Sequence, residues 1–461
     1  MPRRAGFVVA ASHSGAGKTT VTAIVLRRLC QRGLAVRSFK IGPDFIDPGY
    51  HREITGRPSI NLDVWMMGVA GVRRAFRRWS QDAEVSVVEA MGGLYDGMNG
   101  TGRGSAAHVA KTLGLPVVVV LDVWGMTGTT GAILEGLRSF DRGVRIAGCI
   151  LNRVGSRTHA DMIVDALPRR LKPLVLGAIT QDQSLAVQER HLGLVTVDEN
   201  RASERDRGLA QDEAGAELDI ERLLTVTRGG AAVESASVKL GRLRGQPRVR
   251  LAVARDAAFC FYYEENLVAL REAGFELVSF SPVRGDGLPD GTDAVYLGGG
   301  YPERFAVELG ANRGLARQLR ERAQEGMPVY AECGGMMYLA RSLTGFDGVR
   351  HRMAGVLPID VAMDSGYLSI HYVRVRTRVA SPFGDGGVEA LGQEFHQSRV
   401  TAADVEPNLF DVSTSTGASY RAGYLVGNVA ASYVHLHLAG RSRMLRQWVR
   451  CAEGAGRGVS G

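Results

Sequence analysis

The chain has 461 residues, of which 45% are hydrophobic and 23% charged, as in an ordinary soluble globular protein. At roughly 100–200 residues per domain, this length predicts two or three domains. No apolar stretch approaches the roughly 20 residues of a membrane helix, and no cleavable signal precedes the first predicted strand. We therefore expect a cytoplasmic protein that does not contact a membrane. The five cysteines form no Cys-x-x-Cys pair, which argues against structural zinc and a disulfide framework.

The net charge is +8 and the pI is about 9.4. Arginine on a solvated surface accounts for this charge. The alternative is that the positive charge attracts polyanionic small molecules. No run of Lys and Arg is interleaved with aromatic residues, so nucleic acid is not an expected partner.

Short apolar runs alternate with helical patterns through the first half of the chain. Strands are predicted at residues 6–11, 35–40, 85–88, 116–121, 146–151 and 174–179, with a helix over 19–32. Continuous Val, Ile and Leu runs separated by helices predict a parallel sheet that is covered on both faces.

The pattern weakens after residue 229, and Gly, Ala, Ser, Lys and Arg without periodicity predict a linker at 231–247. A second alternation follows. Strands are predicted at residues 248–254, 275–281, 294–297 and 329–331, with helices over 263–273 and 336–342. The fold class is therefore α/β with two domains, 1–230 and 248–450, each a mostly parallel sheet flanked by helices.

Residues 12–20 read Ser-His-Ser-Gly-Ala-Gly-Lys-Thr-Thr and lie between the first strand and the first helix, where a phosphate loop must sit. Backbone N–H groups and the helix dipole favour phosphate there, Lys18 can reach the β- and γ-phosphates, and Thr19 can ligate Mg²⁺. We therefore predict ATP and Mg²⁺ as cofactors. The predicted nucleotide-binding residues in this loop are Ser14, Gly15, Gly17, Lys18, Thr19 and Thr20.

Four acids follow predicted strands of the first domain. Asp44 and Asp47 lie in a Gly/Pro-shaped loop, Glu89 ends a strand, and Asp96 lies in a Gly-rich turn. Ligands of parallel sheets lie beyond the carboxyl ends of the strands, so these acids are expected to face the nucleotide. We predict Thr19, Asp47 and Glu89 as Mg²⁺ ligands. The alternative is turn-forming Asp residues and a solvated Glu.

Cys333 follows a predicted strand and precedes two glycines and a helix, a strand–turn–helix that exposes a nucleophile. The preceding strand ends in glycines whose backbone N–H groups could stabilise an oxyanion. We therefore predict an oxyanion hole at Gly299 and Gly300. His435 and His437 offer a general base. The alternative is a cysteine that only packs in the core.

The motifs together resemble the cobyrinic acid a,c-diamide synthase family, which includes hydrogenobyrinic acid enzymes. They lie at residues 42–48, 61–63, 89–97, 150–153, 298–303, 332–335, 394–396 and 433–437. The resemblance spans nearly the whole chain. It implies an N-terminal domain similar to dethiobiotin synthetase and a C-terminal domain similar to class I glutamine amidotransferases.

The resemblance also implies a reaction. ATP phosphorylates the a and c side-chain carboxylates of a corrin ring, and ammonia from L-glutamine displaces phosphate to leave amides. Asn152 then joins the nucleotide site, and Asp47 is catalytic. The implied substrate-binding residues are Asp44, Phe45, Ile46 and Asp96.

The resemblance assigns the base of the glutaminase to His435. Ordinary class I enzymes carry a Glu two residues after that histidine, and this chain has His437 there. We therefore expect a Cys333–His435 dyad without the usual third residue, and slow glutamine turnover.

Three alternatives remain open at this stage. The first is the same chemistry on nickel-sirohydrochlorin. The second is a cobyric acid synthase, which amidates other side chains. The third is a P-loop partitioning or metallochaperone ATPase, which Cys333 and His435 argue against. The expected partners are cobyrinic or hydrogenobyrinic acid, L-glutamine and ATP, and the sequence leaves homo-oligomer formation open.

Overall fold

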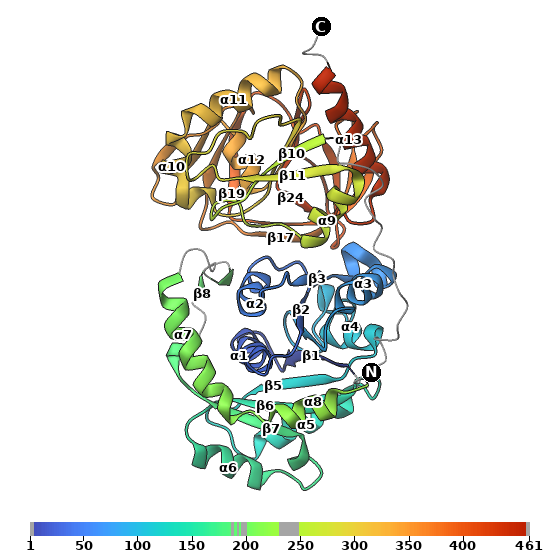
Figure 1. The fold of residues 1–461 in the computed structure, drawn as a ribbon, viewed down its shortest axis with the longest axis vertical. Coiled ribbons are helices and arrows are strands. Elements are labelled where there is room, and N and C mark those ends of the chain that lie inside the picture. Colours follow the sequence, from blue (N-terminus) through green and yellow to red (C-terminus); the bar gives the residue numbers. More distant parts are fainter. Residues whose placement is uncertain (1–3, 186–188, 191–192, 195–200, 230–248, 458–461) are drawn as a thin grey trace. The chain divides into compact units, whose positions relative to one another are not determined.

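The structure is a computed structural model that describes residues 4–185, 189–190, 193–194, 201–229 and 249–457. The chain divides into two units, Met1–Val238 and Lys239–Gly461 (Figure 1). The predicted linker at 231–247 lies outside the described residues. None of the helices in the described part of the chain has the length and apolar character to cross a membrane.

The first unit is built on a seven-stranded sheet in which every neighbouring pair is parallel. In spatial order its strands are β3 (Ile60–Leu62), β2 (Val36–Ile41), β4 (Val85–Glu89), β1 (Ala5–Ala11), β5 (Val117–Asp122), β6 (Ile146–Val154) and β7 (Val175–Thr180). The six predicted strands are thus confirmed. The three-residue β3 was not predicted, because so short a strand carries no periodicity.

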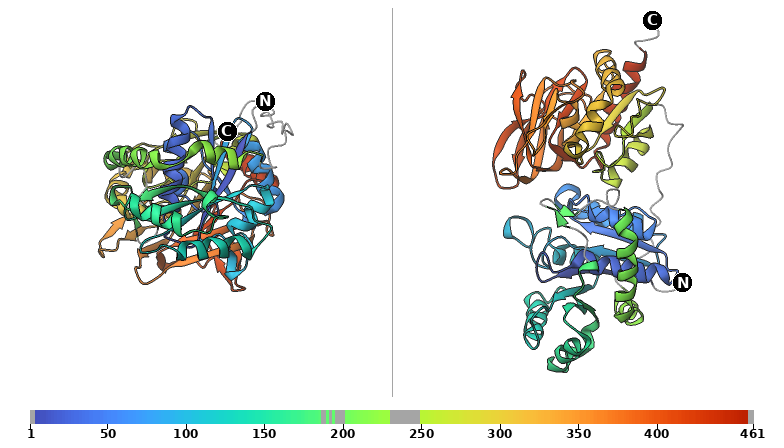
Figure 2. Two further views of the ribbon diagram at one scale, coloured as in Figure 1. Left: turned by 90° about the horizontal axis from the view of Figure 1, so that it is seen from below. Right: turned by 90° about the vertical axis from the view of Figure 1, so that its left-hand side faces the viewer.

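Helices cover both faces of this sheet (Figures 1 and 2). They are α1 (Lys18–Gln31), α2 (Asp47–Thr55), α3 (Val64–Ser80), α4 (Ala106–Leu113), α5 (Thr129–Phe140), α6 (Arg157–Ala166), α7 (Arg201–Ala214) and α8 (Ile220–Thr227). Side chains of β1 alternate between two cores. Val8 and Ala10 pack with α3 to α6, whereas Phe7 and Val9 pack with α1 and α8.

The second unit contains a six-stranded sheet whose first five strands are parallel. In spatial order these are β11 (Phe275–Phe280), β10 (Val249–Ala254), β12 (Ala294–Leu297), β13 (Val329–Glu332), β23 (Val429–Ser432) and the antiparallel β22 (Tyr424–Val426). Its helices are α9 (Glu264–Ala273), α10 (Ala306–Ala311), α11 (Arg313–Gln324), α12 (Gly334–Leu339) and α13 (Ser442–Arg457). Two parallel α/β units confirm the predicted fold class.

Two further sheets of the second unit had no counterpart in the sequence prediction. One is β15 (Arg350–Arg352), β14 (Ser342–Thr344), β16 (Ile359–Met363) and β19 (Ser398–Ala403), and the other is β21 (Ser419–Ala422), β20 (Phe410–Thr414), β17 (Ser369–Thr377), β18 (Glu389–His396) and β24 (Val434–Leu436). A short antiparallel pair in the first unit is β8 (Glu189–Arg190) and β9 (Gly193–Leu194). β24 follows β23 directly but pairs with β18, so the chain changes sheets between Ser432 and Val434.

The helix predicted over 336–342 is wrong at both ends. α12 begins at Gly334, and Ser342 already belongs to β14. A Cβ atom on Gly335 would lie 2.3 Å from the Leu297 carbonyl oxygen. The two glycines therefore form the first helical turn, packed directly on the end of β12, instead of a loop before the helix.

Candidate active sites

The phosphate loop joins β1 to α1, and α1 begins at Lys18. Gly15 and Gly17 have φ values of 81° and 86°, a region that glycine adopts without strain. The Lys18 ammonium donates to the His13 carbonyl at 3.3 Å. Burial and the charge of Lys40 lower the pKa of Lys18. Ser14 and Gly15 are exposed, so the outer part of the loop is open to a ligand.

Asn152, near the end of β6, contacts the phosphate loop. Its side-chain amide donates to the Ala16 carbonyl at 2.9 Å. A Cβ atom on Gly17 would lie 2.2 Å from the Asn152 Nδ2 atom. The Asn152 side chain therefore touches the backbone of the phosphate loop and helps to hold the loop in place.

A lysine that was not predicted as a site residue lies at the centre of the acidic residues. Lys40, the fifth residue of β2, is buried, and its ammonium contacts the carboxylates of Asp47 and Glu89, the latter at 2.8 Å. Asp44 lies 3.6 Å away. The available signal was its place as the last residue of the strand predicted at 35–40, shortly before the motif at 42–48.

Thr19 and Glu89 meet at the same point. The Thr19 hydroxyl donates to Glu89 Oε1 at 2.8 Å and to Asp47 Oδ2 at 3.3 Å. His51, from α2, lies 2.7 Å from the second Glu89 oxygen and 3.1 Å from the Ser59 hydroxyl. The structure thus brings together Thr19, Asp47 and Glu89, the three residues predicted as Mg²⁺ ligands, and adds Lys40 and His51.

The pKa values follow from this arrangement. Burial opposes charge on Lys40, but the carboxylates of Asp47, Glu89 and Asp44 outweigh it and raise its pKa. Burial alone would raise the pKa of Glu89, and Lys40 and His51 reverse that effect and lower it. Burial and the charge of Asp44 raise the pKa of Asp47. The cluster therefore holds Lys40 as an ammonium beside an ionised Glu89.

The remaining predicted substrate-site residues occupy the surrounding loops. Asp44 lies just before α2 and accepts from the backbone N–H groups of Ile46 at 2.7 Å and Asp47 at 3.2 Å. Phe45 is half-buried and Ile46 buried. Asp96 accepts from the Gly93 N–H at 3.1 Å and closes its own turn. The four residues therefore shape the loops around the Lys40 cluster.

The oxygen atoms near Thr19 suit a hard divalent cation. Two carboxylates and a hydroxyl are the ligand types that Mg²⁺ prefers, and Mg²⁺ usually completes its shell with phosphate and water. The described residues contain no group of three or more His, Cys, Asp or Glu side chains arranged to hold a metal unaided. The donor set therefore fits a cation that is bound together with a nucleotide.

Cys333 lies between β13 and α12 with φ 45° and ψ −104°, a strained conformation for a residue with a side chain. Its N–H donates to the Ser432 carbonyl at 2.7 Å, and its sulfur lies 3.8 Å from the Phe395 carbonyl oxygen. Burial and the charge of Glu303 raise the pKa of the Cys333 thiol well above its usual value. The thiol is therefore neutral at rest and needs a base.

The predicted oxyanion-hole glycines lie against both parts of this site. A Cβ atom on Gly299 would lie 2.3 Å from Cε1 of His435, and one on Gly334 would lie 3.1 Å from the Gly300 nitrogen. The Gly298 N–H donates to the Tyr262 hydroxyl at 2.8 Å. Because that donor is occupied, the two following glycines are the better candidates for the hole.

The two candidate bases, His435 and His437, and the nearby His396 of the motif at 394–396 have different surroundings. His435 lies on β24 against Gly299, and burial lowers its pKa to about 3. His437 follows β24, faces Tyr263 at 5.7 Å between ring centroids, and has a pKa that burial lowers to about 4. His396 stacks on Tyr433 with ring centroids 3.7 Å apart. The histidine placed against the glycines is therefore His435.

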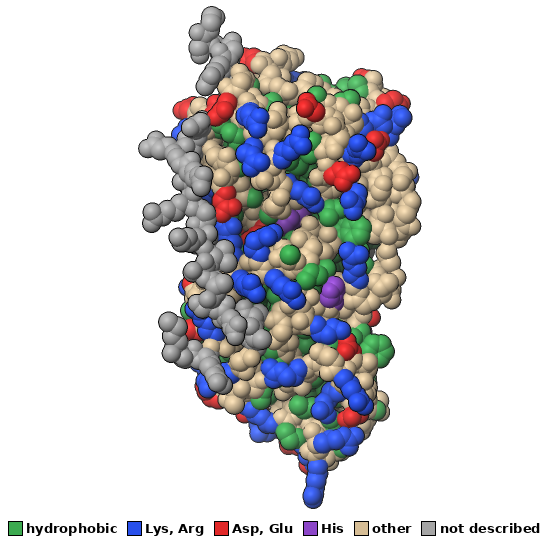
Figure 3. Space-filling view, turned by 90° about the vertical axis from the view of Figure 1, so that its right-hand side faces the viewer, with side chains coloured by type: hydrophobic (Ala, Val, Ile, Leu, Met, Phe, Trp, Pro, Cys, Tyr) green, Lys and Arg blue, Asp and Glu red, His purple; other side chains and the backbone are tan. Residues whose placement is uncertain are grey.

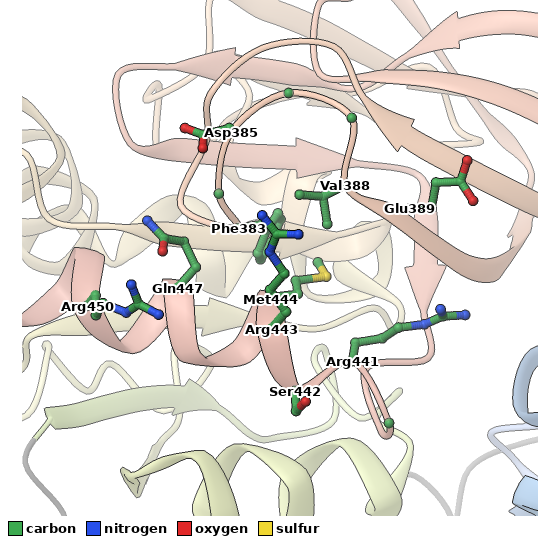
Figure 4. Close-up of a pocket in the computed structure, with 14 residues that line it drawn as sticks. Phe383, Asp385, Val388, Glu389, Arg441, Ser442, Arg443, Met444, Gln447 and Arg450 are labelled. Carbon is green, nitrogen blue, oxygen red and sulfur yellow. The ribbon is translucent and has the colours of Figure 1, made fainter.

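A cavity of about 680 Å³ lies elsewhere in the second unit, at the start of α13 (Figure 4). Arg441, Arg443 and Arg450 line it together with the glycine-rich turn that contains Asp385. None of the predicted site residues lines it. The two clusters of candidate residues are therefore defined by side-chain contacts and not by this cavity.

Known protein families match both units. Residues 7–195 match the CobQ/CobB/MinD/ParA nucleotide binding domain, and residues 250–443 match the CobB/CobQ-like glutamine amidotransferase domain. These matches assign nucleotide binding to the unit with the phosphate loop and glutamine chemistry to the unit with Cys333.

Several relatives match nearly the whole chain. Cobyrinate a,c-diamide synthase of Synechocystis sp. is 40% identical and covers 93% of this chain and 90% of its own. The enzymes of that name from Syntrophotalea carbinolica and Caldanaerobacter subterraneus are 38% and 36% identical and cover 97% and 94% of this chain, and 98% and 95% of their own. The solved structure of PurLQS from Thermotoga maritima covers 45% of this chain and 98% of its own at 18% identity, with a TM-score of 0.33. The chain belongs to the cobyrinate a,c-diamide synthase family and is a glutamine-dependent amide-forming ligase.

Proposed function

We propose that this enzyme amidates the a and c side-chain carboxylates of cobyrinic or hydrogenobyrinic acid, with ATP and glutamine as co-substrates and acyl phosphates as intermediates. The observation that carries the proposal is the cluster of Lys18, Thr19, Lys40, Asp47 and Glu89 beside the phosphate loop. Such a cluster suits phosphoryl transfer to an anionic acceptor, because cations and polar groups must offset charge on both reactants. The Lys and Arg side chains spread over the surface in Figure 3 also favour a substrate with many carboxylates.

In the first unit, a substrate carboxylate oxygen attacks the γ-phosphorus of ATP and ADP leaves. Lys18 offsets the charge of the phosphates, and Lys40, held as an ammonium by its carboxylate neighbours, offsets charge near the acceptor. Thr19, Asp47 and Glu89 would hold Mg²⁺, which supplies further charge neutralisation at the transferred phosphoryl group. Ammonia then attacks the acyl carbon, phosphate leaves, and the nitrogen loses a proton to give the amide.

In the second unit, His435 takes the proton of the Cys333 thiol, and the thiolate attacks the side-chain amide carbon of glutamine. The Gly299 and Gly300 N–H groups stabilise the oxyanion. The proton passes from His435 to the departing ammonia, and water releases glutamate from the thioester. Because burial favours the neutral thiol and the neutral imidazole, the resting enzyme contains little thiolate.

Replacing Asp47 with Asn or Glu89 with Gln should lower the rate of amide formation by at least about 10²-fold, because each change keeps the shape and removes one charge. The rate of glutamate release should stay within a few-fold of wild type. Both rates are measured on the same preparations at saturating ATP. A wild-type rate of amide formation in either variant would contradict the assignment.

His435→Ala should abolish glutamine hydrolysis, whereas His437→Ala should only reduce it. The ring of His435 lies against Gly299, and the ring of His437 faces Tyr263. Glutamate release measures both effects, and alkylation of Cys333 against pH should show a raised thiol pKa in His435→Ala. An inactive His437→Ala beside an active His435→Ala would show that the two roles are reversed.

The substrate is tested by a side-by-side assay of cobyrinic acid, hydrogenobyrinic acid and nickel-sirohydrochlorin with ATP and glutamine. We expect diamide formation from cobyrinic or hydrogenobyrinic acid, identified by mass. Turnover of nickel-sirohydrochlorin alone would replace the proposed substrate. ATP hydrolysis that none of the three stimulates, together with no glutamine hydrolysis, would favour a switching ATPase.

A further inference from the structure

The residue before the predicted nucleophile has a buried carboxylate with an unusual set of neighbours. Glu332 ends β13, and its Oε1 atom accepts from the Tyr330 hydroxyl at 2.6 Å and from the Leu436 N–H at 2.9 Å. Its Oε2 atom accepts from the Tyr296 hydroxyl at 2.9 Å. The side chain therefore connects the nucleophile strand to the backbone of β24 at the residue after His435.

The same carboxylate faces the imidazole of His435. Glu332 Oε2 lies 3.9 Å from Nδ1 of His435, and both side chains are almost completely buried. This separation is longer than a hydrogen bond, but catalytic hydrogen bonds are often long before substrate binds. A carboxylate on one imidazole nitrogen leaves the other nitrogen to serve as the base.

A purely structural role explains this carboxylate poorly. Its described hydrogen-bond donors are two hydroxyls and a backbone N–H, and its described contacts include no lysine or arginine. A buried anion that lacks a cation is costly. A neutral glutamine would avoid that cost, because its amide oxygen can accept from Tyr330 and Leu436 while its NH2 group donates to the Tyr296 hydroxyl oxygen. Burial, partly offset by these hydrogen bonds, raises the pKa of Glu332 to about 7. An imidazolium formed at His435 would supply the missing cation.

His437 does not fill this place. It occupies the sequence position of the usual third residue, but its ring faces Tyr263, with centroids 5.7 Å apart. A neutral imidazole also cannot balance an imidazolium as a carboxylate does. The carboxylate that lies 3.9 Å from Nδ1 of His435 comes instead from the strand that ends just before the nucleophile.

We propose that Glu332 is the positioning residue of the glutaminase, an inference that rests on the proposed roles of Cys333 and His435. Its carboxylate accepts the Nδ1–H of His435, so that Nε2 carries no proton and can take the one from the thiol. When that proton moves from sulfur to Nε2, the new imidazolium is balanced by the Glu332 carboxylate. The proton then leaves with ammonia, and Glu332 carries the same charge after the cycle as before it.

The test compares full-length wild type with Glu332→Gln, which keeps the shape and removes the charge. We expect kcat for glutamine hydrolysis to fall by about 10²–10⁴-fold with KM changed only a few-fold, since the lost interaction forms with the imidazolium. Amide formation from high ammonium should stay near wild type. Glu332→Asp, which keeps the charge on a shorter side chain, should retain more activity than Glu332→Gln.

The pH dependence of Cys333 alkylation distinguishes a positioning role of Glu332 from a purely structural one. Without the carboxylate the imidazolium is less stable, so alkylation of Cys333 should require a higher pH in Glu332→Gln than in wild type and Glu332→Asp. Several titratable groups of the described residues interact with Glu332, Cys333 or His435: three tyrosines with Glu332, two acids and a tyrosine with Cys333, and a histidine with His435. They are Tyr262, Tyr296, Tyr330, Glu303, Glu394, Tyr433 and His396. Burial and the charge of Glu332 raise the pKa of Tyr296 and Tyr330, so neither ionises over the assay range.

Asp360 provides a matched control. It is another largely buried carboxylate of the same unit, bonded by Ser342, Arg341 and Arg350 in a different sheet. Asp360→Asn should lower the melting temperature and leave both kcat for glutamine and the alkylation profile at wild-type values.

The outcomes distinguish this inference from the proposed function. If wild type hydrolyses glutamine and Glu332→Gln does so at the same rate, the inference is wrong and the proposed function stands. If Glu332→Gln loses activity only in proportion to a lower melting temperature, with an unchanged alkylation profile, Glu332 is a structural tie and the inference is again wrong. If wild type itself does not hydrolyse glutamine, the proposed function is wrong, and the inference about Glu332 is wrong with it.

Discussion

Replacing Cys333 with serine is expected to lower glutamine-dependent amide formation by at least about 10⁴-fold, as for loss of other catalytic nucleophiles. Amide formation from high ammonium at raised pH should remain, because the phosphoryl-transfer cluster belongs to the other unit and needs only ammonia as its nitrogen source. A serine hydroxyl is a far weaker nucleophile than a thiolate, and His435, whose pKa burial lowers to about 3, is a weak base for it.

The measurement is amide formation with glutamine and with ammonium in parallel, followed by mass. Cys149→Ser is a suitable control, because Cys149 is also buried but lies in β6 of the other unit. It should keep both activities. A Cys333→Ser enzyme that is inactive with ammonium, under conditions where wild type is active, would show that the thiol is needed for more than glutamine hydrolysis.

The parallel sheets were predictable because their strands carry the signal within themselves. Runs such as residues 117–122 are buried on both faces and therefore read as continuous apolar sequence. The antiparallel strands of the second unit, such as β17 and β20, alternate buried and exposed residues and take their partners from distant sequence. Without knowledge of those partners, these strands could not be assigned to sheets of their own.

The candidate site was predictable where glycine and strand ends fix a backbone, as at residues 12–20 and at Cys333. It was not predictable where a role depends on what a side chain meets after folding. Lys40 and Glu332 each end or nearly end a strand, and sequence alone does not show that one lies among three carboxylates and the other beside His435. Lys40 ends the strand predicted at 35–40 and Glu332 begins the motif at 332–335, and only the folded structure distinguishes them from their neighbours.

Of the two buried lysines near the phosphate loop, Lys18 gives the cleaner test of phosphoryl transfer. Removing Lys40 would leave Asp47 and Glu89 buried without their cation, and breaking such a pair costs about 3–5 kcal/mol of stability. Lys18 contacts the His13 carbonyl instead, and burial already lowers its pKa. Its removal therefore threatens the fold less than the loss of Lys40 would.

Lys18→Ala is expected to lower amide formation by at least about 10³-fold with either glutamine or ammonium, since the phosphates lose the cation that offsets their charge. Glutamate release should continue, because Cys333 and His435 belong to the other unit. Lys111→Ala, which removes an exposed lysine paired with Asp141, is the matched control and should keep both activities. If Lys18→Ala also stops glutamate release while its melting temperature is unchanged, then the nucleotide site controls the glutaminase, and the two units do not act independently.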